Sequence, residues 1–348
     1  MPSLFDPIKV KGLSLKNRLV MPPMATNMAT EDGEVTDRHI RHYTNRARGG
    51  VGLIIVEHTY VSKDGKLSRG QMGLYDDKLI PSLKRLVEAI HAEGTKVVIQ
   101  LNHAGAKAPR DITGEQPVGP WNVMPPNGSE VPRPLTIPEI KAIIARFGEA
   151  AYRAIEAGFD SIELHGAHGF LLCQFLSPYT NRRNDAYGSD LAGRLLFPLE
   201  VIREVKTKLG ENAPLFYRFG ADDMVEGGLT RQEAKLAARQ LEQAGVDVID
   251  VSGGLGGGGH ERFTQQGYFI PLAEGIKRMV KVPVIGVGNI TEPEYADRIV
   301  REQRVDMVAF GHMLLSNPEF PKQAAQKLGV NHFTTGSICR GDKAGVGT

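Results

Sequence analysis

The feature that most limits how this chain can fold is an alternation, repeated eight times, between a short apolar run and a longer helical pattern. The apolar runs are predicted strands, at residues 18–21, 51–56, 96–101, 161–164, 214–219, 247–251, 282–287 and 306–310. Several are apolar at nearly every position, which is typical of parallel strands buried on both faces. The helical patterns cover residues 36–48, 79–93, 137–157, 193–209, 231–244, 271–280, 292–301 and 320–327. Eight such units predict an α/β fold, a (β/α)8 TIM barrel; the alternative, a doubly wound open sheet, usually has fewer strands.

The ends of several helical segments carry signals of their own. In a capping box a threonine oxygen accepts a backbone N–H and a glutamate three residues later reaches back. The sequence predicts such boxes at Thr136, Thr230 and Thr291. Glycines that tolerate a left-handed backbone are expected just past helix ends, at Gly49, Gly94, Gly158, Gly210 and Gly245.

The chain is predicted to form one barrel domain over residues 1–335, followed by a Gly-rich tail at 336–348 that is flexible or lies at a subunit contact. Residues 7–17, PIKVKGLSLKN, have the pattern of a small hairpin that plugs the barrel floor. Two long loops, 103–135 and 165–192, follow the third and fourth strands. That side of a barrel is where active sites form, and long loops in a compact domain are usually functional.

Composition excludes several classes of protein. A net charge of +2 over 348 residues gives no sign of a nucleic-acid or membrane-surface partner. The chain has no apolar run near the roughly 18 residues of a membrane span and no signal peptide at its start, so a cytoplasmic protein is expected. Its two cysteines, Cys173 and Cys339, form no CxxC pattern, which argues against a disulfide framework, an iron–sulfur cluster or a zinc site.

Polar residues and glycines gather where the predicted strands end, which in a barrel indicates catalysis or binding. They are Gln100, His103, His165, His168, Arg218, Ser252, Gly286, Gly288, Gly311 and His312. Glycines after the seventh and eighth strands let backbone N–H groups approach a phosphate, although glycine also serves simply to end a strand.

Five stretches make the chain recognisable. They are LFDPIKVKGLSLKNRLVMPPM at 4–24, VVIQLNHAG at 97–105, ELHGAHGFLLCQFLSPYTNRRNDAYGSDLAGR at 163–194, VPVIGVGNIT at 282–291 and VAFGHMLLSNPEF at 308–320. Together they resemble, in the right order and over essentially the whole chain, the old yellow enzyme family of FMN-dependent ene-reductases. The resemblance implies a flavin across the barrel mouth, with its phosphate near the seventh and eighth strands.

The resemblance also implies roles for individual residues. Arg218 is expected to place positive charge near N1 and C2=O of the flavin, and Gln100 to bind the pyrimidine part of the ring. The other residues implied at the cofactor are Pro23, Met24, Ala25, His58, His165, Ser252, Gly253, Gly286, Gly288, Asn289, Gly311 and His312. In the family, two residues at this spacing donate hydrogen bonds to the carbonyl or nitro oxygen of the substrate, which favours hydride addition at its β-carbon. His165 and His168 are therefore the expected catalytic pair.

Two other interpretations of the histidine pair stay open. One or both rings are satisfied by backbone groups at a strand end, or they bind a metal with Glu163 and His103. No paired carboxylates or cysteines complete such a metal site, so no metal is expected.

The chain departs from the family pattern at several positions. Phe170 stands where many relatives have a tyrosine, the presumed proton donor to the α-carbon. Tyr60, Tyr179, Tyr268 or solvent are possible replacements. His58 stands where relatives have a small residue, and it is either an acid or base or a structural histidine. Ala25 and Asn27 replace a redox-tuning cysteine and a tyrosine of one branch.

The predicted function is reduction of an activated C=C bond in a small electrophilic molecule, with FMN as cofactor and NADH or NADPH as electron donor. Because Phe170 cannot donate a proton, the alternative is a dehydrogenase, a double-bond isomerase or a nitroreductase. A non-redox, phosphate-binding barrel lyase or isomerase is a more remote alternative. The chain ends without cluster-binding cysteines, so we expect direct reduction by the nicotinamide. A homo-oligomer is left open, since an arginine near the C-terminus enters the neighbour's active site in some relatives, and Arg340 is the candidate here.

Overall fold

The eight predicted strands form one closed parallel barrel. The structure, a computed structural model, describes residues 1–257 and 264–330. In barrel order the strands are β3 (Leu19–Met21), β4 (Leu53–Tyr60), β5 (Lys96–Asn102), β8 (Ser161–Gly166), β9 (Leu215–Gly220), β10 (Val248–Ser252), β11 (Val284–Gly286) and β12 (Met307–Ala309). β12 pairs with β3 and closes the barrel, with Val308 opposite Leu19. The TIM barrel is therefore confirmed over the open sheet.

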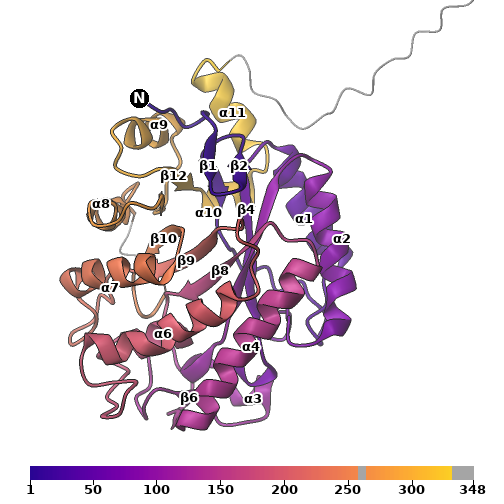
Figure 1. Ribbon diagram of the computed structural model, residues 1–348. Helices are drawn as coiled ribbons and strands as arrows, with labels where there is room; N and C mark the ends of the chain where they lie inside the picture. Colours follow the sequence, from indigo (N-terminus) through magenta and orange to yellow (C-terminus); the bar gives the residue numbers. More distant parts are fainter. Residues whose placement is uncertain (258–263, 331–348) are drawn as a thin grey trace, which may run out of the picture.

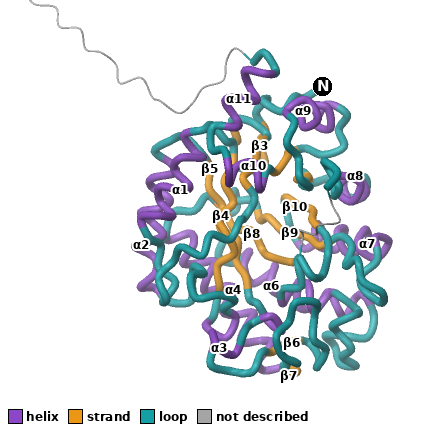
Figure 2. The backbone as a smooth tube through the Cα atoms, turned by 180° about the vertical axis from the view of Figure 1, so that it is seen from behind, coloured by secondary structure: helices purple, strands orange, loops and turns teal. Residues whose placement is uncertain are grey.

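Helices surround the strands on the outside, as the two opposite views in Figures 1 and 2 show. They are α1 (Asp37–Arg48), α2 (Ile80–His91), α4 (Ile137–Glu156), α6 (Leu191–Lys206), α7 (Arg231–Ala244), α8 (Ile270–Lys277), α9 (Pro293–Arg301) and α11 (Phe320–Lys327), and each overlaps a predicted helical segment. On α4 the buried residues Ile140, Ile144 and Phe147 recur at helical spacing and face the barrel core. No helix in the described ranges is long and apolar enough to cross a membrane.

Two of the three predicted capping boxes are confirmed, before α4 and α7. Thr136 accepts the backbone N–H of Glu139, whose carboxylate accepts the N–H of Thr136 at 2.8 Å, and Thr230 does the same with Glu233. The box at Thr291 is wrong, because α9 begins one residue later, after Glu292. The backbone N–H groups of Thr291 and Glu292 both donate to the side-chain oxygen of Gln266, at 2.8 Å each, and this distant residue replaces the box.

Three of the five predicted left-handed glycines are confirmed: Gly94, Gly158 and Gly245 have φ of +68°, +92° and +105°. Gly49 is wrong by one position: it has φ of −63°, and the left-handed residue is Gly50 at +98°. Gly210 has no positive φ, because α6 ends four residues earlier, at Lys206.

The predicted hairpin closes the barrel floor. β1 (Ile8–Val10) and β2 (Leu13–Leu15) pair antiparallel (Figure 1). Their buried side chains pack in one cluster with inward-facing residues of the barrel strands, Val20, Leu53, Ile55, Val98, Phe216, Val248, Ile285 and Met307. The floor is thus sealed by apolar contact, and the barrel opens only toward its other end.

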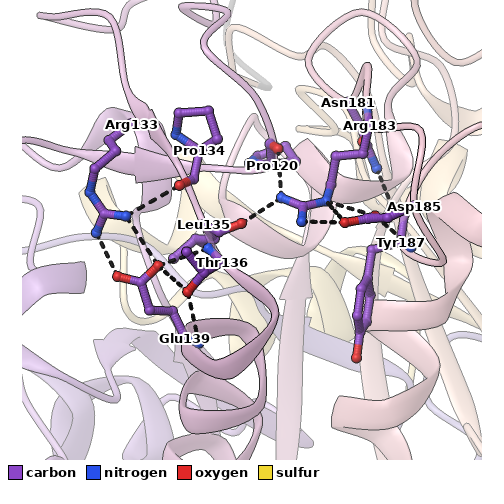
Figure 3. Close-up of polar contacts among 10 residues, drawn as sticks. All are labelled: Pro120, Arg133, Pro134, Leu135, Thr136, Glu139, Asn181, Arg183, Asp185 and Tyr187. Atoms are coloured by element: carbon purple, nitrogen blue, oxygen red, sulfur yellow. Dashed lines mark hydrogen bonds and ion pairs between the residues drawn. The ribbon is translucent and has the colours of Figure 1, made fainter.

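The two long loops at that end carry short elements. The first contains η3 (Gly105–Lys107), α3 (Arg110–Thr113), β6 (Val118–Gly119) and β7 (Arg133–Pro134), and the second contains α5 (Leu171–Leu176); η1 (Lys63–Gly65), η2 (Asp77–Leu79) and α10 (Gly311–Ser316) follow other strands. Arg183 joins the two loops by donating to the carbonyls of Pro120 and Leu135, at 3.1 and 2.6 Å, while pairing with Asp185 (Figure 3). The loops are therefore fixed against each other. The predicted tail at 336–348, with Cys339 and Arg340, lies outside the described residues.

Candidate active site

A cavity of about 330 Å³ opens at the C-terminal ends of the barrel strands. It brings together most of the residues that the sequence singles out: Pro23, Met24, Ala25, His58, His165, His168, Phe170, Arg218, Ser252, Tyr268, Asn289, Gly311 and His312. Seven other candidates do not line it: Gln100, His103, Gly253, Gly286, Gly288, Tyr60 and Tyr179. The cavity is thus built from loops that are far apart in sequence and meet only because the barrel closes.

The two histidines of the HxxH pattern face the cavity side by side. His165 is in β8, and its ring lies 5.3 Å from that of His168 at nearly a right angle. His168 has a left-handed backbone, φ +57°, a strained conformation of the kind that clusters at functional sites. Its Nε2 lies 2.7 Å from the hydroxyl of Ser252. Within the described residues, Nδ1 of His165 has no hydrogen-bond partner.

Both imidazoles are neutral at neutral pH. Burial, reinforced by His168 and the cations Arg218 and Lys107, lowers the pKa of His165 well below its ordinary value. Burial and the same two cations lower the pKa of His168 in the same direction. A neutral imidazole has one N–H to donate and one nitrogen to accept with, so each ring can still offer one hydrogen bond to a ligand.

Phe170 lies against the histidines in the cavity wall. Its ring is 4.6 Å from that of His165 and 5.4 Å from that of His58. The position at which the resemblance implies a tyrosine hydroxyl is therefore occupied by a phenyl ring in this chain.

His58 is held by a neighbouring amide. Gln71 donates from Nε2 to Nδ1 of His58 at 2.6 Å and reaches its carbonyl oxygen at 3.2 Å. Burial lowers the pKa of His58 to about 4, so this ring is also neutral at pH 7.

A polar layer lies just beneath the cavity, inside the barrel. Gln100 donates from Nε2 to Glu163 at 2.8 Å, while its Oε1 has no partner within the described residues. Arg218 reaches up into the cavity and lies 3.6 Å from the buried carboxylate of Asp250. Burial, with the charge of Asp250, raises the pKa of Glu163 well above its ordinary value. Gln100 thus belongs to this layer and not to the cavity wall.

The metal interpretation finds no support in the positions of its residues. His103 accepts the N–H of Gly105 at its Nδ1 and has its Nε2 3.6 Å from Asp64, whereas Glu163 is bonded to Gln100. No group of three or more His, Cys, Asp or Glu residues suited to a metal ion occurs in residues 1–257 and 264–330.

Of the three tyrosines considered as proton donors, the structure brings only Tyr268 to the cavity. The hydroxyl of Tyr60 donates to the carbonyl of Asp32 at 3.1 Å, away from the cavity. Tyr179 does not line the cavity. Burial raises the pKa of Tyr268, which weakens it as an acid.

Close packing around the glycines predicted at the cofactor explains why these positions lack a side chain. A Cβ on Gly286 would lie 2.7 Å from side chains of Ile270 and Val305, and one on Gly253 would lie 3.0 Å from the Phe269 ring. Gly288 has φ of +135° and passes so close to residues 268 and 269 that a Cβ would meet their backbone nitrogens. Gly311, which does line the cavity, leaves room for the sulfur of Met24.

Two features escaped the sequence reasoning. Lys107, from η3, lines the cavity, and its signal was only a lone lysine two residues after HAG. Glu57, buried in β4, accepts both the backbone N–H and the hydroxyl of Thr26, at 2.7 and 2.6 Å. Through Thr26 it fixes the segment 22–25 that forms one wall of the cavity.

The cavity fits a phosphorylated aromatic cofactor. No carboxylate occurs among the described residues that line it, whereas two cations, Lys107 and Arg218, do. Within the described residues, Oε1 of Gln100 accepts no hydrogen bond, and Nε of Arg218 donates none although it lies 3.6 Å from Asp250. Buried polar atoms of this kind need partners, and a bound ring with its own donors and acceptors supplies them.

Comparison with known proteins agrees with this chemistry. Residues 3–331 match the NADH:flavin oxidoreductase / NADH oxidase family. An NADH oxidase of Thermoanaerobacter brockii is 48% identical over 336 residues, covering 93% of this chain but 51% of that protein. An NADPH dehydrogenase of Listeria monocytogenes is 42% identical over 331 residues, covering 94% of this chain and 96% of that protein. The old yellow enzyme homologue from Zymomonas mobilis, a solved structure, has 27% identity and a TM-score of 0.84, covering 97% of this chain and 95% of that one.

The chain therefore spans about half the length of the Thermoanaerobacter protein and nearly all of the Listeria one. These matches replace the non-redox lyase or isomerase alternative and confirm FMN as cofactor and a nicotinamide as electron donor. The chain belongs to the NADH:flavin oxidoreductase / NADH oxidase family, the family of old yellow enzyme, whose chemistry uses FMN together with NADH or NADPH.

Proposed function

We propose that this protein uses NADH or NADPH to reduce an activated C=C bond, in an enone or a related conjugated electrophile. The observation that carries the proposal is the imidazole pair His165 and His168, neutral, side by side and facing the cavity, with one ring nitrogen unpartnered within the described residues. Such a pair can hold the oxygen of an acceptor from two sides.

The residues that would hold FMN come from three parts of the cavity. The segment Pro23–Ala25 forms the wall fixed by Glu57, Arg218 reaches in from the polar layer that also holds Gln100, and Asn289, Gly311 and His312 lie near the last two strands. When bound, FMN supplies a hydride to a conjugated acceptor after it has been reduced by the nicotinamide. The positive charge of Arg218 favours electron-rich forms of a ring beside it, and the raised pKa of Glu163 favours the uncharged form of that carboxyl group.

The histidine pair contributes by stabilising charge. Negative charge develops on the acceptor oxygen as a hydride reaches the β-carbon, and an N–H already aimed at that oxygen stabilises it without reorganisation. Loss of one such donor costs enzymes about 10²- to 10³-fold in rate. The hydroxyl of Ser252, 2.7 Å from Nε2 of His168, fixes the orientation of that ring.

A second candidate function rests on Phe170. Its aromatic face lies 4.6 Å from His165, where relatives present a hydroxyl. Nitro-group reduction, a dehydrogenation or a double-bond isomerisation does not need a tyrosine to protonate an α-carbon.

One experiment separates these candidates. The FMN-loaded protein is reduced anaerobically with NADH and, separately, with NADPH, and is then mixed with enones, dienes and nitro compounds while the flavin absorbance is followed. Ene-reduction predicts reoxidation by enones with a saturated product. Reoxidation by nitro compounds alone would favour the second candidate and overturn the first.

A further inference from the structure

We infer that Lys107 is the proton donor to the α-carbon of the acceptor, replacing the hydroxyl that is missing at position 170; this inference rests on the proposed function. Neither the sequence motifs nor the family match assigns a role to this lysine.

The side chain of Lys107 is fixed inside the cavity. Its Nζ donates to the carbonyl oxygen of His168 at 3.1 Å and lies 5.1 Å from the centre of the Phe170 ring. The ammonium is thus attached to the backbone of the histidine pair and covers the face of the residue that replaces tyrosine. An ammonium has three N–H groups, so two remain for a ligand.

The charges around Nζ favour release of a proton. No carboxylate in the described ranges forms an ion pair with Lys107, while Arg218 and the neutral rings of His58, His165 and His168 share its cavity. Burial lowers the pKa of Lys107, although the nearby thiol of Cys173 acts weakly in the opposite direction. A lysine whose pKa falls toward the working pH becomes an effective general acid.

The other candidates considered in the cavity are less suited to give up a proton at neutral pH. The histidine rings are neutral, and burial raises the pKa of Tyr268. A guanidinium does not release its protons in proteins, which leaves Arg218 as a fixed charge. Of these candidates, Lys107 is therefore the cation that can release a proton.

The step balances with reagents that the established chemistry supplies. NADH or NADPH provides, by way of the cofactor, the hydride that forms the new bond at the β-carbon. The π electrons of the C=C bond then form a bond between the α-carbon and a proton from Nζ. The N–H electron pair stays on nitrogen, and the neutral amine regains its proton from water.

Two substitutions separate proton delivery from charge. Lys107→Met removes both, whereas Lys107→Arg keeps the positive charge but cannot release a proton. Lys66→Met is a matched control, because Nζ of Lys66 also lies over an aromatic ring, 5.4 Å from the centre of Tyr60, and donates to a carbonyl, that of Glu31, at 2.5 Å. Lys66 does not line the cavity.

Each protein is loaded with FMN, photoreduced without oxygen and mixed in a stopped-flow instrument with 2-methyl-2-cyclohexenone, whose α-carbon becomes a stereocentre. Removal of a general acid predicts reoxidation slower by about 10²- to 10⁴-fold in Lys107→Met and in Lys107→Arg, with no such loss in Lys66→Met. The 2-methylcyclohexanone formed should lose enantiomeric excess in both Lys107 variants. Adding Phe170→Tyr to Lys107→Met should restore the rate at least tenfold.

Three results would overturn the inference. They are a Lys107→Met rate within threefold of wild type, full recovery in Lys107→Arg, or an unchanged enantiomeric excess. If Lys107→Met does not fold or bind FMN, the rate and enantiomeric excess of Lys107→Arg decide alone. A wild-type protein that no enone reoxidises refutes the proposed function instead, so the two failures are distinct.

Discussion

Glu57 offers a direct test of how the cavity wall is held. Its buried carboxylate accepts two hydrogen bonds from Thr26 and one from the hydroxyl of Tyr43 at 3.2 Å, and lies 3.5 Å from Nε2 of His39. Glu57→Ala leaves all of these donors without their acceptor. We therefore expect both a loss of stability and a loosened segment 22–25.

The magnitude follows from the number of bonds lost. Each hydrogen bond to a charged group is worth about 1.5–3 kcal/mol, but such bonds share one carboxylate and are not additive. Breaking a buried charged pair costs about 3–5 kcal/mol, and we expect Glu57→Ala to fall in that range. Glu57→Gln keeps one acceptor oxygen and should lose about half as much.

The direction in which the stability contributed by Glu57 changes with pH follows from the pKa of its carboxyl group. Burial alone would raise the pKa of Glu57, but the nearby ring of His39 and the hydrogen bonds from Thr26 outweigh it, and the pKa is lowered. The folded state therefore binds its proton less readily than the unfolded chain does. The stabilisation is present above the ordinary glutamate pKa of 4.5 and is lost as the pH falls below it.

The assay is urea unfolding of the FMN-free protein at pH 7, paired with fluorescence titration of FMN. Glu88→Ala, at an exposed glutamate of α2, is the control and should stay within about 0.5 kcal/mol of wild type. FMN should bind more weakly to Glu57→Ala only. A loss below about 1 kcal/mol with unchanged FMN affinity would refute the role of Glu57 in fixing the wall.

Two further predictions concern a cavity residue and a buried acid. Phe170→Tyr alone should leave enone reoxidation within about threefold of wild type, since the cavity already holds an acid; a rise of a hundredfold or more would show that the native site lacks a donor. Burial raises the pKa of Asp223 from 3.8 to about 6, so the folded state holds this proton more tightly and the free energy of unfolding should fall as the pH rises from about 4 to 6. Asp223→Asn should flatten that slope in urea unfolding series, and a slope that persists would assign it to other groups.

The sequence was sufficient for the barrel because each strand is buried on two faces. The run at 51–56 is apolar throughout and that at 96–101 is apolar except at Lys96 and Gln100, and eight such runs with intervening helices leave few other folds. The capping box at Thr291 failed because Gln266, from a different loop, accepts the N–H of Thr291 that the box would use, and accepts that of Glu292 as well. A contact between segments distant in sequence has no local pattern to reveal it.

Site residues that belong to a sequence motif could be predicted, whereas those that only tertiary packing brings to the cavity could not. The HxxH spacing placed His165 and His168 together, as the structure shows. Lys107 belongs to no motif, and only the meeting of η3 with the loop after β8 brings it over Phe170. Gln100 was expected at the cavity surface, but its bond to Glu163 holds it in the layer beneath.

The proposed mechanism depends most on hydrogen bonds from His165 and His168 to the oxygen of the acceptor beside FMN. The direct measurement is anaerobic stopped-flow reoxidation of photoreduced, FMN-loaded protein by 2-cyclohexenone, for wild type and for the double variant His165→Ala/His168→Ala. We predict that the double variant still shows the yellow flavin spectrum and that its reoxidation is slower by at least about 10²-fold. Reoxidation at the wild-type rate would contradict the role given to the pair.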